Sequence, residues 1–116
     1  MSNYRRLDVW KAAHQLTLTI YKETARFPSH ERFGLTTQLR RAAVSIGANL
    51  AEGSGRGGKE YARFIMIAAG SASEVEYLLL VATDLGYFDG GRLESEVGII
   101  ARQLTLLRRR VLRANP

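Results

Sequence analysis

Apolar residues recur at intervals of three and four along most of the chain, which is the spacing of helices with one buried face. This pattern predicts helices over approximately 7–27, 34–53, 59–85 and 91–114. The first stripe consists of Trp10, Ala13, Thr17, Ile20, Thr24 and Phe27, and the last of Leu93, Val97, Ile100, Leu104, Leu107 and Val111. No segment alternates apolar and polar residues for long, so no strand is predicted.

Short connections separate these segments. Pro28 and Ser29 end the first, a glycine-rich stretch from Gly53 to Gly58 ends the second, and "DLGYFDGGR" ends the third. We expect Gly53 to adopt the left-handed conformation that often ends a helix. Short connections make successive helices antiparallel neighbours. The sequence therefore predicts an all-α fold, an antiparallel up-and-down four-helix bundle that forms a single domain over residues 1–116.

The third segment is apolar over more than one stripe. From Phe64 to Val81 it is interrupted mainly by small residues, which let neighbouring backbones approach closely. A helix that is apolar over most of its circumference is buried on most sides, whereas a small bundle leaves each helix one wet face. We therefore predict that this helix also meets another subunit, in a homo-oligomer.

Charge is distributed unevenly along the chain, whose net charge is +6. Six acids and one base lie between Glu74 and Glu96, and no acid follows Glu96. The bases after that point are Arg102, Arg108, Arg109, Arg110 and Arg113. Second basic patches are Arg5 with Arg6, and Arg56 with Lys59 and Arg63. Arginine suits phosphate through its forked geometry, so these residues predict binding of RNA or DNA; the alternative is a solvated surface that keeps the protein soluble.

The glycine-rich stretch imitates two nucleotide-binding motifs. Gly53, Gly55 and Gly58 fit G-x-G-x-x-G. Gly53 to Lys59 fit most of the second motif, G-x-x-x-x-G-K followed by Ser or Thr. The first motif needs a preceding strand, but helical spacing precedes it here, and the second needs Ser or Thr where Glu60 stands. We interpret the stretch as a connector that offers at most one phosphate contact at a helix N-terminus.

Other catalytic or metal chemistry finds little support in the sequence. The chain has no cysteine, and neither His14 nor His30 belongs to the Glu-x-x-His motif of di-iron bundles. Glu74 and Glu76 are two residues apart and point to different sides of a helix. We expect His14 to be packed or hydrogen-bonded rather than a ligand. We therefore predict no catalytic site, no metal, no cofactor and no enzyme activity.

The chain shows no signal-peptide pattern and no apolar run long enough to span a bilayer in its middle. We accordingly expect a cytoplasmic protein without a membrane partner.

Polar residues accompany the apolar stripe near the end of the second helix. Together with one acid of the third helix they are Arg40, Arg41, Ser45, Asn49, Glu52 and Glu74. Buried polar groups need partners, so we predict a structural clamp in which Glu52 or Glu74 pairs with Arg40 or Arg41. This clamp would fix the second helix against the third or against a neighbouring subunit. The alternative is a polar ligand pocket.

The stretch "LRRAAVSIGANLAEGSGR", followed by "EYARFIMIAAGSASEVEYLL", resembles the four-helix-bundle protein family encoded by 23S rRNA intervening sequences. That family includes the accessory variability proteins of diversity-generating retroelements. The resemblance runs from "LDVWKAAHQLT" to "DLGYFD". It implies a homopentameric ring, no established enzyme activity and, for the retroelement members, binding to nucleic acid and to a reverse transcriptase. The chain departs from the family at Gly47, where proline is usual, and at Ala69, where a basic residue is common.

Two functions remain open. The first is a non-enzymatic oligomeric bundle that binds RNA or DNA through phosphate contacts, and the second is a scaffold whose partner is another protein. A small-molecule enzyme has only the incomplete glycine motif in its favour.

Overall fold

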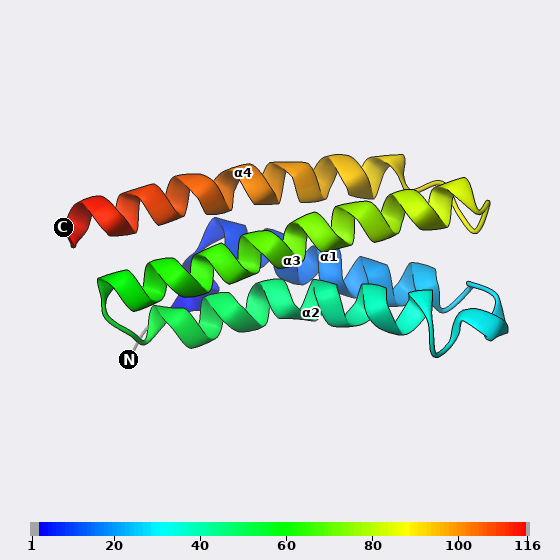
Figure 1. Ribbon diagram of the computed structural model, residues 1–116, viewed down its shortest axis with the longest axis horizontal. Helices are drawn as coiled ribbons and strands as arrows, with labels where there is room; N and C mark the ends of the chain where they lie inside the picture. Colours follow the sequence, from blue (N-terminus) through cyan, green and yellow to red (C-terminus); the bar gives the residue numbers. More distant parts are fainter. Residues whose placement is uncertain (1–2, 116) are drawn as a thin grey trace.

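The computed structural model describes residues 3–115 and consists of four long helices packed side by side (Figure 1). They are α1 (Asp8–Thr24), α2 (Leu35–Ser54), α3 (Gly58–Asp84) and α4 (Gly91–Ala114). Two short 3₁₀ turns, η1 (Tyr4–Arg6) and η2 (Ser29–Glu31), precede α1 and α2. Successive helices run antiparallel, and the bundle measures 47 × 22 × 20 Å. The predicted all-α four-helix bundle is confirmed.

The core lies along the axis between the four helices. Each helix contacts its two neighbours in the order α1, α2, α3, α4, and the most extensive contacts are those of α3 with α2 and α4. The large side chains with almost no exposure are Leu16, Ile20, Leu39, Ile46, Leu50, Ile65, Val75, Leu79, Val97, Ile100 and Leu104. On α1 the buried face follows Ala13, Leu16 and Ile20, whereas Trp10 and Thr17 of the predicted stripe are only half-buried. All of these large side chains recur with helical spacing, and their burial is the main favourable term in folding.

Helix α1 ends at Thr24, three residues before the predicted end at Phe27. The N–H groups of Arg26 and Phe27 bond to carbonyls three residues back rather than four, so the chain tightens ahead of Pro28. The Phe27 side chain is nevertheless buried in the core. Its burial explains why the apolar stripe runs past the end of the helix.

Gly86 ends α3 in the left-handed conformation, with a φ of 79°. The N–H of Tyr87 bonds to the Ala82 carbonyl and the N–H of Gly86 to the Thr83 carbonyl, which together form a Schellman motif. Among the residues that the structure describes, this glycine is the only one with positive φ. The stop signal "DLGYFDGGR" therefore acts through its first glycine.

The expectation for Gly53 is wrong. This residue is helical and buried inside the last turn of α2, and its φ is not positive. A Cβ atom built on it would lie 2.5 Å from Cβ of Phe64 on α3, closer than real Cβ contacts come. Glycine is needed here because two helices touch, not because the chain reverses.

The outer face of α3 is apolar and exposed. We define it by Met66, Ile67, Gly70, Tyr77 and Leu80, which follow helical spacing on the side away from the core. Contrary to the expectation that no apolar run in the middle of the chain is long enough to span a bilayer, α3 has the length and mean hydropathy of a membrane-crossing helix, properties that core helices of soluble proteins share. In the bundle, its opposite side packs against α2 and α4.

Candidate functional site

Basic residues from three separate parts of the sequence lie at one end of the bundle. This end, which we call the basic end, holds η1, the α2–α3 connection and the last turns of α4 (Figure 1). Its bases are Arg5, Arg6, Lys11, Arg56, Lys59, Arg63, Arg108, Arg109, Arg110 and Arg113, and its acids are Asp8, Glu52 and Glu60. The antiparallel order of the helices thus brings all the predicted basic patches together. Only Arg102 is set apart, in the middle of α4.

The opposite end lacks this excess of bases. This end, which we call the acidic end because six of the acids lie in it, holds η2 and the α3–α4 connection. Its acids are Glu23, Glu31, Asp84, Asp89, Glu94 and Glu96, and they are matched by Lys22, Arg26, Arg32, Arg40, Arg41 and Arg92. Positive charge is therefore concentrated at one end of the 47 Å axis.

Arg110 joins the separate parts of the basic end. It lines one hollow of about 330 Å³ together with Arg6, and a second of about 390 Å³ together with Arg56 and the glycines of the α2–α3 connection. Arg109, Arg110 and Arg113 are exposed, whereas Arg108 is half-buried. The Arg108 Nε atom is buried and forms no hydrogen bond within residues 3–115. The exposed arginines are thus better placed than Arg108 to meet a ligand.

Arg56 is already engaged by its neighbours. It donates a hydrogen bond of 2.6 Å to Glu52, lies 3.7 Å from a carboxylate oxygen of Glu60, and stacks 5.0 Å from the ring centre of Phe64. The hydrogen bond to Glu52 raises the pKa of the Arg56 guanidinium. Its charge is largely balanced within the α2–α3 connection, so it is a weaker phosphate ligand than the sequence indicates.

The α2–α3 connection is closed against the end of α4. The Asn115 side chain lies directly over Gly58, where any Cβ would collide with it. Gly57 precedes α3 without a side-chain cap, and Glu60 stands in the first helical turn. The first backbone N–H groups of α3 are therefore partly covered by Asn115 and lie beside the carboxylate of Glu60. A nucleotide-binding loop instead leaves these N–H groups open to phosphate.

The predicted polar clamp forms other pairs within the chain. Arg40 bonds to Thr24 Oγ1 at 2.8 Å and to the Tyr21 carbonyl at 3.1 Å, so it ties α2 to the end of α1. Glu52 pairs with Arg56, while Arg41 and Glu74 are exposed and form no ion pair within residues 3–115. The predicted pairing does not form inside one chain: Glu52 lies eleven residues from Arg41 and twelve from Arg40 on the same helix, and Arg40 and Glu52 have other partners. A pairing with a neighbouring subunit stays a prediction.

Serine hydroxyls, rather than charges, join α2 to α3 at this level. The hydroxyls of Ser45 and Ser71 lie 2.8 Å apart. Asn49 Nδ2 donates to the Ser45 carbonyl at 2.8 Å and lies 3.0 Å from its hydroxyl. Of the predicted clamp residues, Ser45 therefore joins α2 to α3 without an arginine, and Asn49 bonds to it from the same helix.

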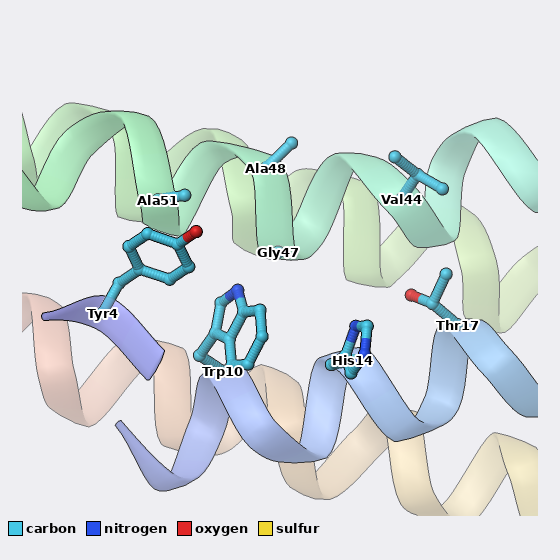
Figure 2. Close-up of a pocket in the computed structure, with 8 residues that line it drawn as sticks. All are labelled: Tyr4, Trp10, His14, Thr17, Val44, Gly47, Ala48 and Ala51. Carbon is cyan, nitrogen blue, oxygen red and sulfur yellow. The ribbon is translucent and has the colours of Figure 1, made fainter. Parts of the chain in front are cut away.

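An aromatic hollow that the sequence does not reveal lies between α1 and α2 (Figure 2). We define it by its lining residues, Tyr4, Trp10, His14, Thr17, Val44, Gly47, Ala48 and Ala51. Its volume is about 300 Å³. His14 is exposed and Trp10 is half-buried, and the His14 ring packs flat against the ring of Trp10. The only sequence signal is that Trp10 and His14 are four residues apart, on one face of α1.

Within the part of the chain that the structure describes, no group of three or more His, Cys, Asp or Glu side chains could hold a metal ion.

Comparison with known proteins agrees with the resemblance seen in the sequence. The family model described as "23S rRNA-intervening sequence protein" matches residues 5–106. A crystal structure of a protein with unknown function from the S23 ribosomal protein family of Bacteroides thetaiotaomicron superposes with a TM-score of 0.77. The two chains are 21% identical, and the match covers 86% of this chain and 97% of the other. This likeness shows the fold alone. None of the curated proteins matches the sequence.

Proposed function

We propose that this chain, which belongs to the 23S rRNA-intervening sequence protein family, is a non-enzymatic protein that binds RNA or DNA through phosphate contacts. The observation that carries the proposal is the basic end, where ten bases from three parts of the sequence accompany three acids. A cluster of one sign of charge raises the local concentration of a polyanion and speeds its association. Such a cluster is the usual electrostatic footprint of nucleic-acid binding.

The exposed arginines are the best candidates for direct contacts. Arg5 and Arg6 extend from η1, and Arg109, Arg110 and Arg113 from the end of α4. Their planar guanidinium groups can donate two hydrogen bonds to one phosphate. Contacts to phosphate position a protein on nucleic acid without reading its sequence, so we expect binding to be weakly specific and to decrease steeply with added salt.

We also propose that the bundle assembles with copies of itself through the outer face of α3. Met66 and Tyr77 on this face are 53% and 64% exposed, with the exposed Ser73 and Glu74 between them, and apolar side chains gathered on one exposed face commonly mark an interaction site. The family resemblance favours a pentameric ring. A ring would present several basic ends at once and would strengthen binding to a long nucleic acid through avidity.

The test of nucleic-acid binding compares the same charge change at the two ends of the bundle. Arg109→Glu with Arg110→Glu reverses two exposed charges at the basic end. The matched control, Arg26→Glu with Arg92→Glu, reverses two exposed charges at the acidic end and leaves the net charge equal to that of the first variant. The control loses only ion pairs to Glu23 and Glu96 on the surface, and such pairs contribute about 0–1 kcal/mol each.

Binding to a fluorescent single-stranded RNA is then measured by anisotropy at several salt concentrations. We expect the basic-end variant to bind at least tenfold more weakly than the control and its salt slope to fall by about 2, one for each lost phosphate contact. Equal weakening of both variants would mean that only net charge matters. If wild-type protein does not bind at low salt, the proposal fails and a protein partner becomes the better candidate.

A further inference from the structure

One wall of the aromatic hollow is a continuous set of aromatic rings. The rings of Trp10 and His14 are stacked, with centroids 5.0 Å apart and an interplanar angle of 8°. Tyr4 meets Trp10 edge-on at 5.2 Å and 67°. Figure 2 shows all three side chains on the α1 and η1 side, facing α2 across the hollow. Exposed aromatic faces of this kind are the surfaces on which unpaired bases stack.

The other wall consists of small residues. Trp10 packs directly against Gly47, where an added Cβ would lie only 3.3 Å from Nε1, and Ala48 and Ala51 leave the hollow open beside this contact. The resulting volume of about 300 Å³ is at the lower limit of small-molecule sites, which suits one planar ring system. The indole N–H faces Gly47, whereas the Tyr4 hydroxyl forms no hydrogen bond within residues 3–115 and remains available to a ligand.

Two bases neighbour the aromatic wall along the chain. Arg5 follows Tyr4 and Lys11 follows Trp10, whereas Arg6 and Asp8 line the separate hollow against α4. The Arg5 guanidinium lies 6.0 Å from the centre of the Tyr4 ring. An occupant that combines a flat ring with adjacent negative charge matches this arrangement, and a nucleotide within a single strand has both.

We infer that the aromatic hollow binds one unpaired base of a single-stranded nucleic acid, while Arg5 and Lys11 hold the phosphates on either side. The base enters from the open side beside His14 and continues the stack of aromatic rings. This inference rests on the proposed nucleic-acid binding and adds to it a preference for single strands over duplexes, whose bases are already stacked.

The test uses Trp10 as the reporter, because it is the only tryptophan in the chain. Two oligonucleotides of equal length are compared, an oligothymidylate and an abasic strand that keeps the phosphates and lacks the bases. We expect the first to quench Trp10 fluorescence and to bind about 5- to 100-fold more tightly, the range that stacking of one base provides. The abasic strand is expected to bind through its phosphates without quenching.

Two variants locate the effect in the hollow. Gly47→Leu fills it from the α2 side, because a Cβ at this position lies 3.3 Å from Trp10 Nε1, and leucine is a good helix former. His14→Ala removes the exposed ring. Both should bring the affinity for oligothymidylate close to that for the abasic strand and leave the abasic affinity unchanged. Leu18→Ala, at an exposed position on the same helix but outside the hollow, is the control and should keep the preference. Circular dichroism verifies that each variant is helical.

The outcomes separate this inference from the proposed function. Equal affinities for the two strands, or binding without a change in Trp10 emission, overturn the base site and leave phosphate binding intact. Failure of both strands to bind overturns both proposals. Emission that responds to protein concentration and to neither strand would mean that a second copy of the chain covers the hollow, which also overturns the base site.

Discussion

At the scale of single residues, glycines in this bundle have different roles that composition does not separate. Gly86 supplies a left-handed turn, whereas Gly53 allows α2 and α3 to touch. Gly98, in the middle of α4, has neither role, since its nearest neighbour would lie at an ordinary 3.6 Å from an added Cβ. Substitution by alanine should therefore have opposite effects at Gly53 and Gly98.

We predict that Gly53→Ala destabilises the fold by about 1–3 kcal/mol, because the new methyl group overlaps Phe64 in a packed contact. Gly98→Ala should stabilise the fold by about 0.5–1 kcal/mol, because alanine loses less backbone entropy in a helix. Urea unfolding followed by circular dichroism measures both. If Gly53→Ala left the free energy of unfolding unchanged, α2 and α3 would be able to move apart at this contact without cost.

At the scale of elements, the two connections at the acidic end are tied together by one tyrosine. Tyr87, from the α3–α4 connection, donates a 2.7 Å hydrogen bond to Glu31 of η2, and Glu31 also accepts from the N–H of Leu35 at the start of α2. His30 Nε2 lies 3.3 Å from the same tyrosine oxygen. The bond from Tyr87, followed by that from Leu35, lowers the pKa of Glu31 below its ordinary 4.5. The bond to Glu31 raises the pKa of Tyr87 above 10.0.

These shifts predict a window of pH in which the link stabilises the fold. A lowered carboxylate pKa contributes stability above pH 4.5 that is lost as the pH falls through the folded-state value. A raised tyrosine pKa contributes stability below pH 10.0 that is lost as the pH rises through its folded-state value. Tyr87→Phe should therefore lower the Tm most between these limits, with the difference from wild type shrinking on both sides.

Tyr77→Phe is the matched control for this prediction, because Tyr77 is exposed and forms no hydrogen bond within residues 3–115. Its Tm should follow that of the wild type at every pH. A Tm difference for Tyr87→Phe that did not change with pH would show that packing of the ring against Phe27, and not the hydrogen bond, holds the connections together.

At the scale of the whole molecule, the bundle has two surfaces that a single chain does not use, the outer face of α3 and the basic end. Met66→Glu with Tyr77→Glu should give a folded monomer, because these side chains are exposed in the bundle and would be desolvated only in an assembly. Leu18→Glu with Ile99→Glu makes the same change on α1 and α4 and should keep the oligomer. Light scattering after size exclusion measures the mass; a wild-type monomer would contradict the proposed assembly.

Much of this molecule follows from the sequence alone, because its contacts are largely those of neighbouring helices. The apolar spacing predicts four helices, and short connections leave little choice other than antiparallel neighbours. The excess of arginine after Glu96 is equally plain from the sequence. Helical periodicity and net charge are local or additive properties, so neither requires knowledge of which residues meet across the fold.

The tertiary structure decided which residues pair with one another between and along the helices. Only the packed bundle shows that Gly53 faces Phe64, that Arg40 bonds to the end of α1 rather than to an acid, and that Glu52 pairs with Arg56. The aromatic hollow likewise depends on small residues of α2 facing Tyr4, Trp10 and His14. Such pairs depend on the rotation of each helix about its own axis and on its register along its neighbours. A shift of one residue turns a helical side chain by about 100°, so a spacing pattern accurate only to the nearest face cannot specify them.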